Sequence, residues 1–200
     1  MKRATHTQLG IFCLLVALGV LGRWIGPKSG WFDLPPNFTP MAAIGLLAGY
    51  LFAGRAMALA VPLAALAISN LALESYDDWK VGAAVYVSFL VAPLLGRSLR
   101  QRTTAIKIIV AATLPAVLFY LTTNFAQWVV DGQHLHSMYS RDLSGLLNCY
   151  AAGIPFFRSM LEGDVLFGGV LFGLYALAAV WSGPRRMMRQ PVYEEKPRRR

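Results

Sequence analysis

The sequence predicts an all-α membrane protein: a bundle of six transmembrane helices with both termini in the cytoplasm. Two features of the composition support this class. The 200 residues are 56% hydrophobic and only 14% charged, with a mean hydropathy of +0.48, whereas a soluble domain is about 25% charged. The net charge is +9, but the apolar fraction argues against a soluble nucleic-acid-binding protein, because too little polar surface remains to keep a globule dissolved.

The third observation is the order of apolar segments along the chain. Six stand out, at residues 9–25, 40–54, 56–73, 81–96, 108–130 and 165–181. A helix that crosses the hydrocarbon core needs about 20 apolar residues, and most of these segments approach that length. Lys2 and Arg3 precede the first segment as they would in a signal peptide. Arg23-Trp24 at its end is more typical of an interfacial anchor.

Residues 40–73 could form one helix or two. One helix would be about 50 Å long, against a hydrocarbon core of about 30 Å. It would also hold Arg55 near the middle of the membrane, at roughly 2.5–3.5 kcal/mol. A turn at Gly54-Arg55 avoids both costs. The sequence therefore favours six spans, with five as the alternative.

The charges orient the bundle. With six spans, one set of connecting segments carries 14 basic and 2 acidic residues, and the other carries 5 basic and 8 acidic residues. The positive-inside rule places the first set, with both termini, in the cytoplasm. We therefore expect a membrane domain over residues 1–182 and a basic, disordered tail over 183–200. The tail could bind anionic lipid headgroups or act only as a topology anchor.

The segment between the fifth and sixth spans is too long and too apolar for a simple linker. Apolar residues at helical spacing predict a short amphipathic helix on the outer side; they are Leu143, Leu146, Leu147, Tyr150 and Ala151. Gly153-Ile154-Pro155 is expected to end that helix, and Asp164 to cap the last span. Spacing by four also predicts helix-packing faces at Gly45, Gly49 and Ala53 and at Gly169 and Gly173, for contact within the bundle or with a partner.

No enzyme motif is present: the chain has no HExxH, G-x-S-x-G, P-loop or CxxC sequence. We therefore expect a non-enzymatic protein with no catalytic residues, no cofactor and no metal. Two weaker alternatives use the outer loop. Asp131, His134 and His136 could bind a metal, and together with Asp164 they could serve an intramembrane enzyme. Their spacing matches no catalytic arrangement.

Polar and aromatic residues gather at the predicted outer ends of the spans. Thr39 is expected to cap the short second helix with Pro40 as its first residue, and a helix N-terminus offers free N–H groups to a ligand. The polar groups of the third and fifth spans could line a pocket or make interhelical hydrogen bonds. Arg158 could hold an anionic group or anchor the chain at the interface. The candidate substrate-binding residues are Asn37, Thr39, Asn70, Asn124, Gln127, Trp128, Tyr150 and Arg158.

Several stretches resemble an uncharacterised family of small bacterial membrane proteins labelled as transport proteins. They are NFTPMAAIG at 37–45, TNFAQW at 123–128, GLLNCYAAGIPFFR at 145–158, GD at 163–164 and LFG at 171–173. The resemblance covers about residues 9–182. That family is in turn similar to the S-components of energy-coupling-factor transporters, six-helix proteins that capture a ligand outside and dock on a coupling subunit with ATPases. Where S-components often present an Ala-xxx-Ala docking face, this first span has Cys13, Ala17 and Leu21.

The sequence and the resemblance together imply a substrate-binding transport component in the bacterial inner membrane. It would contact lipid, a small-molecule ligand and a possible transmembrane coupling subunit with ATPases, but no nucleic acid. The alternative is a non-catalytic accessory or assembly subunit of a larger membrane complex.

Overall fold

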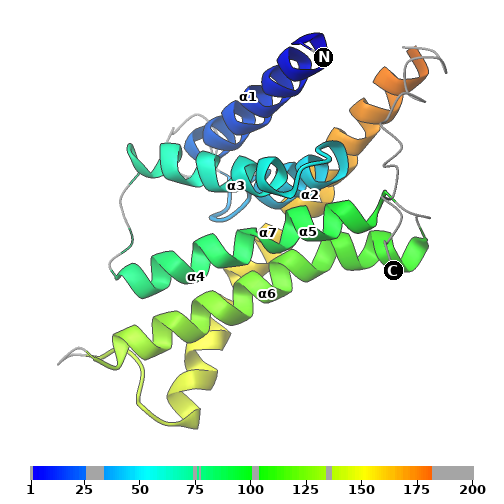
Figure 1. Cartoon of the computed structure of the whole chain (residues 1–200). Coiled ribbons are helices and arrows are strands. Elements are labelled where there is room, and N and C mark those ends of the chain that lie inside the picture. The colour runs from blue at the N-terminus through cyan, green and yellow to red at the C-terminus, as the bar shows by residue number, and fades with distance from the viewer. Residues whose placement is uncertain are drawn as a thin grey trace, which may run out of the picture.

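A computed structural model describes residues 2–25, 34–73, 76, 78–100, 104–133 and 137–181, with side chains from residue 6 onward. Within these ranges the chain is helical and has no strand. The helices are α1 (Lys2–Ile25), α2 (Met41–Leu51), α3 (Arg55–Asn70), α4 (Trp79–Phe89), α5 (Val91–Ser98), α6 (Ala105–Asp131) and α7 (Leu143–Trp181) (Figure 1). The predicted tail 183–200, His134 and His136 lie outside the described residues.

The seven helices form six rods, because α4 and α5 are continuous except for a break at Leu90. Pro93 explains this break: it has no N–H to donate to the carbonyl of Phe89, four residues earlier. At the break, the amide of Leu90 donates to the carbonyl of Val87, three residues back, at 3.1 Å. The order and number of rods therefore agree with the six predicted apolar segments, and the all-α class is confirmed.

The chain between residues 40 and 73 forms two helices, as the position of Arg55 predicted. α2 ends at Leu51, Phe52 and Gly54 have extended backbone, and α3 begins at Arg55. α2 and α3 contact one another. This short connection excludes the single 34-residue helix on which the five-span alternative depended.

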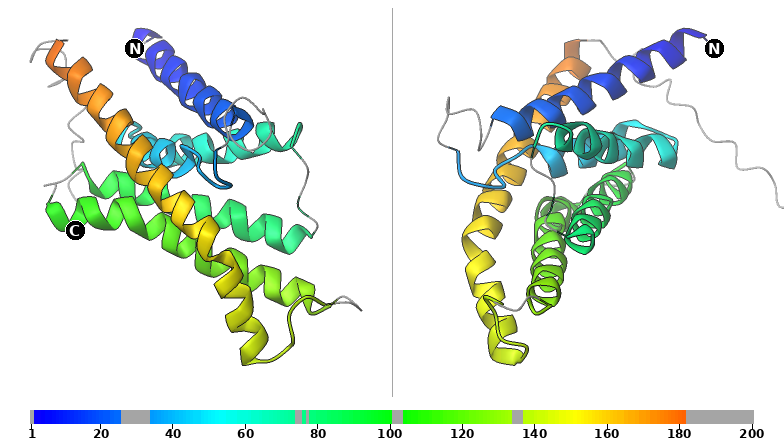
Figure 2. Two further views of the ribbon diagram at one scale, coloured as in Figure 1. Left: turned by 180° about the vertical axis from the view of Figure 1, so that it is seen from behind. Right: turned by 90° about the vertical axis from the view of Figure 1, so that its left-hand side faces the viewer.

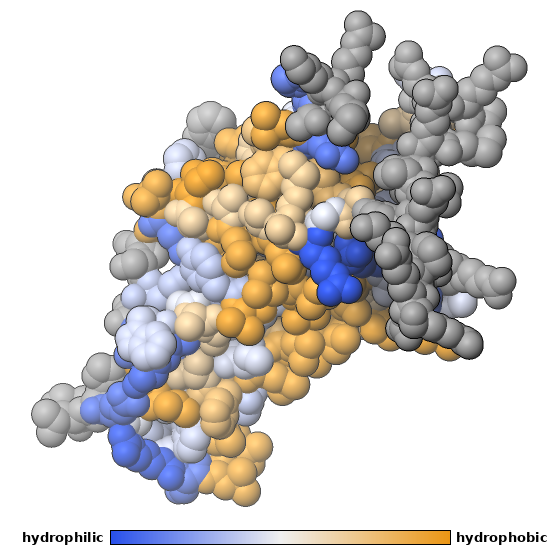
Figure 3. All heavy atoms as spheres, in the orientation of Figure 1, coloured by the Kyte–Doolittle hydropathy of each residue, from blue (hydrophilic) through white to orange (hydrophobic). Residues whose placement is uncertain are grey.

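Among the described residues, four stretches are long and apolar enough to cross a membrane: His6–Ile25, Trp79–Ser98, Ala105–Asp131 and Leu143–Trp181. α2 and α3 are shorter apolar helices. Large apolar side chains are exposed along α1, α6 and α7, among them Leu14, Ile109 and Leu174. Apolar surface covers the middle of the molecule, and polar residues gather over the α6–α7 connection (Figure 3). These features are compatible with a multi-pass membrane protein.

α2 lies at the centre of the bundle and contacts α1, α3, α4, α5, α6 and α7. All residues from Met41 to Gly49 are buried. The contact with α5 is close because both helices present glycine: a Cβ at Gly49 would overlap the carbonyl of Pro93, and one at Gly96 would overlap the carbonyl of Leu46. The predicted packing face at Gly45 and Gly49 is therefore confirmed, and its partner is α5.

α7 differs most from the prediction. The expected amphipathic helix and the last span are one continuous helix of 39 residues, about 58 Å long, which crosses one face of the bundle (Figure 2). Pro155 lies inside it, although proline removes one hydrogen bond. Gly153 does not end the helix but lets it approach α6. Asp164 is consequently not a helix cap: it lies within α7 and is buried.

Candidate functional site

The segment before α2 forms a tight turn held against α7. The amide of Phe38 donates to Pro35 at 3.1 Å, and Asn37 has a positive φ of 65°, a conformation that asparagine tolerates better than most residues. The Ser159 hydroxyl donates to the Pro36 carbonyl, and the rings of Phe38 and Phe167 lie 5.5 Å apart. α7 therefore fixes the position of Asn37 at the entrance to α2.

α6 and the first half of α7 are joined by side chains that donate to backbone carbonyls. The Tyr120 hydroxyl donates to Tyr150 at 2.6 Å, and the Tyr150 hydroxyl donates to Leu121 at 2.9 Å. The helices also approach one another at Gly153, where a Cβ would overlap the carboxamide of Asn124. The Asn124 amide itself donates to the Tyr120 carbonyl at 2.8 Å. This packing holds the Asn124 side chain in the space between the two helices.

A cavity of about 180 Å³ opens where these elements meet. It brings together three of the predicted site residues: Asn37 from the turn, and Asn124 and Gln127 from α6. The other lining residues are Val81, Phe119, Tyr120, Thr123, Gly153, Phe156, Phe157 and Met160. We call this the outer cavity, after the side on which the charge pattern places it.

The outer cavity combines unpaired carboxamides with aromatic walls. The side chains of Asn37 and Gln127 make no hydrogen bond within the described part of the chain, and the Asn124 side-chain oxygen accepts none. A carboxamide both donates and accepts, so three of them can match the mixed polar edge of a ligand. Phe119, Phe156 and Phe157 offer apolar surface. A dry cavity of about 150 Å³ can hold benzene, so this volume fits a molecule with about one ring.

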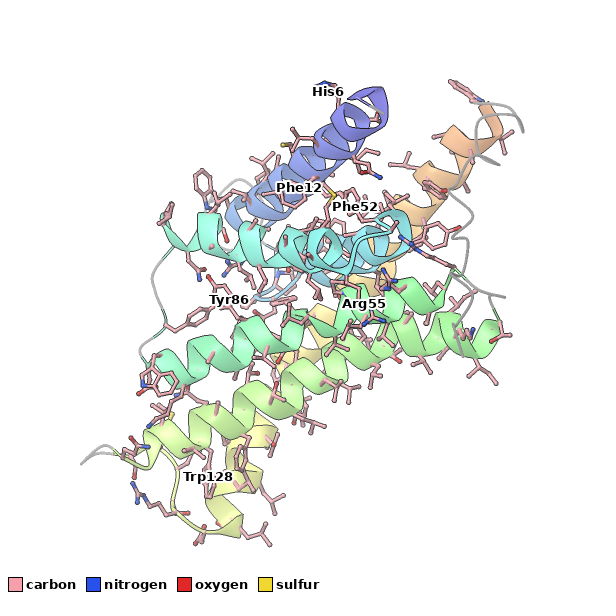
Figure 4. All side chains as sticks on the ribbon, in the orientation of Figure 1. His6, Phe12, Phe52, Arg55, Tyr86 and Trp128 are labelled. Carbon is pink, nitrogen blue, oxygen red and sulfur yellow. The ribbon has the colours of Figure 1, made fainter. Side chains whose placement is uncertain are left out.

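The structure places Asn70 outside this cavity. The Arg23 guanidinium donates to the Asn70 side-chain oxygen at 2.8 Å and to the Ser69 hydroxyl, and the Asn70 amide donates to the Tyr86 hydroxyl at 3.2 Å. Asn70 therefore joins the ends of α1 and α3 to α4, from which Tyr86 projects (Figure 4). Interhelical hydrogen bonding, the alternative reading for this residue, is what the structure shows.

Four other predicted site residues do not line the outer cavity either. Trp128 lies near the end of α6 (Figure 4), donates to the Ser140 carbonyl at 3.0 Å and lines a separate cavity of about 310 Å³ with Arg141. Tyr150 is engaged with Leu121, and Arg158 is exposed. Thr39 makes no capping hydrogen bond, because the N-cap position is Pro40 and α2 begins one residue later than predicted. Trp128 and Asn124 therefore line two separate cavities.

The acidic residues of the α6–α7 connection organise its backbone. Asp131 accepts from the amides of Met138 and Tyr139, at 3.1 and 2.8 Å. Asp142 accepts from the Ser140 hydroxyl at 2.6 Å and from the Gly145 amide at 2.8 Å. These two hydrogen bonds hold the pKa of Asp142 below its usual value. Burial raises the pKa of Tyr139. These contacts account for Asp131 and give the start of α7 its capping residue.

Sequence reasoning missed Tyr120, Gly153 and the phenylalanines of the outer cavity. The resemblance included Gly153 and Phe156-Phe157. Because a helix end was expected at Gly153-Ile154-Pro155, these residues were not placed opposite Asn124. A helical reading through Pro155 would have placed Gly153, Phe156 and Phe157 on neighbouring positions of one face. The buried, unpaired state of Asp164 had no such signal, because an acidic residue before an apolar run resembles a helix cap.

Comparison with known proteins finds no match among curated proteins and none among solved structures. A sequence family does match residues 3–186, which is nearly the whole chain. The chain belongs to this family, DUF6580, whose function is unknown.

Proposed function

We propose that this protein is a multi-pass component of the bacterial cytoplasmic membrane that binds a small molecule for transport, in the manner of an S-component. The observation that carries the proposal is the convergence of Asn37, Asn124 and Gln127 on one cavity with free hydrogen-bonding capacity and aromatic walls. Ligand sites in proteins have this composition: a mostly apolar concavity with a few placed polar groups. The basic bias of the sequence supports cytoplasmic termini, with the outer cavity facing the other side.

The geometry restricts the ligand class. The volume suits about one ring, and the carboxamides suit a ring edge that both donates and accepts hydrogen bonds. None of the described residues that line the cavity is charged, so a neutral heterocycle fits better than an anion. Energy coupling would come from a partner, a transmembrane coupling subunit with ATPases, because the chain has no P-loop.

The test begins with the purified protein and identifies co-purifying small molecules by mass spectrometry. Binding of a panel of neutral heterocycles is then measured by thermal shift, since a ligand that binds only the folded state stabilises it. Gln127→Leu should weaken binding about fivefold, the effect of losing a hydrogen bond of about 1 kcal/mol. Gln133→Leu is the matched control, because Gln133 contacts Lys80 and does not line this cavity.

Gly153→Ala offers a second variant that should preserve the fold. The three atoms nearest to its Cβ would all belong to the Asn124 carboxamide, a side-chain group that can rotate away, so binding should fall while the melting temperature changes little. An empty cavity and no saturable response across the panel would refute the proposal. Equal binding by wild type and both cavity variants would show that the ligand lies elsewhere.

An accessory subunit of a larger membrane complex is the second candidate. The observation that favours it is the exposed apolar face of the second half of α7, which includes Leu174, Leu177 and Val180. Lipid can also cover such a face. The transport component and the accessory subunit are therefore distinguished by the size of the assembly that contains the protein. A large complex that survives gentle solubilisation and contains other subunits would favour the accessory role.

A further inference from the structure

A second and larger cavity lies along the second half of α7. Its volume is about 620 Å³, and it shares no lining residue with the outer cavity. α2 contributes Leu46 and Tyr50, α6 contributes Ile108, Ala111 and Ala112, Leu99 follows α5, and the remaining walls come from α7. We call it the α7 cavity. Three helices and Leu99 line it, and its volume lies within the range of small-molecule sites, about 300–1,000 Å³.

The walls of the α7 cavity are apolar apart from three residues. Tyr50 and Tyr175 carry hydroxyls, and Asp164 carries the one carboxyl group among the lining residues. Asp164 is 2% exposed, and neither of its carboxyl oxygens has a hydrogen-bond partner among the residues that the structure describes. Leaving a buried carboxyl unpaired is costly. Ionisable residues within membrane helices mark functional sites by default, so this carboxyl calls for a partner that the described part of the chain does not supply.

The cavity is elongated, with the carboxyl at one end. Its α7 wall runs from Asp164 to Ala179, fifteen residues apart and therefore about 22 Å along the helix. Gly168, Phe172 and Ala176 lie between them on the same helical face. Tyr175, toward the other end, is close enough to Arg100 for an electrostatic interaction. A cationic group in the cavity therefore belongs at the Asp164 end.

We propose that the α7 cavity binds an elongated lipophilic amine, with its ammonium group paired to Asp164 and its apolar chain along α7. An ammonium group supplies the charge and the donors that this carboxyl lacks, and the apolar walls match an alkyl chain. A neutral lipid chain would fill the same volume but leave the carboxyl unpaired. The site is independent of the outer cavity, so either can fail without the other.

The test compares dodecylamine with 1-dodecanol, two probes of equal chain length that differ in the charged group. Binding to the purified full-length protein in a non-ionic detergent is titrated by native mass spectrometry. We expect one saturable dodecylamine site, with 1-dodecanol at least tenfold weaker. Asp164→Asn should reduce dodecylamine affinity at least tenfold and leave dodecanol unchanged. Asparagine has nearly the same size and shape as aspartate and lacks only its ionisable group, so this variant should fold.

Two glycine variants test the location. A Cβ at Gly169 or at Gly173 meets no atom within 4 Å, but only Gly169 lines the cavity. Gly169→Leu should therefore fill the cavity and abolish dodecylamine binding, while Gly173→Leu should bind as the wild type does. Equal affinity for the amine and the alcohol, or no effect of Asp164→Asn, would overturn the proposal. So would a co-purified phospholipid or a second protein chain that occupies the cavity and that dodecylamine does not displace.

Discussion

Two pairs of glycines with the same spacing have opposite environments. Gly45 and Gly49 of α2 lie against α5: a Cβ at Gly45 would lie 3.0 Å from Ala92, and one at Gly49 would overlap the Pro93 carbonyl. Gly169 and Gly173 of α7 have the same four-residue separation, yet a Cβ at either meets nothing within 4 Å. The sequence pattern is identical, but among the described residues only the first pair packs against another helix of this chain.

The difference shows what small residues can and cannot specify. A glycine pair lets a neighbouring backbone approach, but whether one arrives depends on the rest of the fold. α2 is surrounded by other helices and buries nearly its whole length. The second half of α7 has neighbours on one side, and its small residues instead widen a cavity. We expect the first region to determine stability and the second to be available for a ligand.

The largest expected effect is at the packed pair. Gly49→Ala places a methyl group into the Pro93 carbonyl, which cannot move without displacing α5. Overpacking of this kind costs about 1–3 kcal/mol and occasionally more, and a clash with backbone should reach the upper end of that range. The free energy of unfolding, measured in mixed micelles, should fall by about 3 kcal/mol.

Gly54→Ala is the control for that substitution. Gly54 precedes α3, has an ordinary φ of −72°, and a Cβ there meets nothing within 4 Å. Its unfolding free energy should remain within about 0.5 kcal/mol of the wild type, as for most surface substitutions. A Gly49→Ala protein as stable as Gly54→Ala would show that α2 and α5 do not pack this closely.

A smaller effect of opposite sign is expected at the α7 cavity. Asp164→Leu replaces a buried carboxyl without a hydrogen-bond partner with an apolar side chain beside an apolar cavity. Removing an unsatisfied buried polar group recovers about 1–3 kcal/mol, so the melting temperature should rise. Dodecylamine binding should be lost in the same variant, so that stability and binding change in opposite directions.

The matched control is Asp131→Leu. Asp131 accepts from the amides of Met138 and Tyr139, so removing its carboxylate leaves two donors unpaired, and the melting temperature should fall. If Asp164→Leu also lowers the melting temperature, the carboxyl has a structural partner. The α7 region would then contribute to stability, as the α2 region does, and the contrast between the two glycine regions would be weaker.

The sequence predicted most of the fold because helix formation in this chain follows local hydropathy. The apolar segments, and the turn required by Arg55, correspond to the observed rods. The failures lie where tertiary contact overrides a local signal. Gly153 and Pro155 resemble a helix end, but Gly153 serves close approach to Asn124, and α7 continues through both.

The candidate site was predicted only in part, because tertiary contacts decide which polar residues meet. Asn37, Asn124 and Gln127 converge, because the turn before α2 and the end of α6 meet at α7. Asn70 and Tyr150 are also polar residues of the predicted site, but other helices satisfy their hydrogen bonds. Sequence spacing places side chains on one helix face. It does not indicate which neighbouring groups satisfy them.

The smallest expected effect comes from the same Gly→Ala exchange at Gly169 and Gly173, and it has the opposite sign. Gly169→Ala adds a methyl group where no atom lies within 4 Å, so it introduces no clash. Alanine within a helix is favoured over glycine by about 0.5–1 kcal/mol, and the unfolding free energy should rise by that amount. Gly173→Ala should give the same gain. The same exchange, Gly→Ala, should therefore destabilise α2 and stabilise α7, and a loss of stability at Gly169 would mean that another chain or helix packs on α7 there.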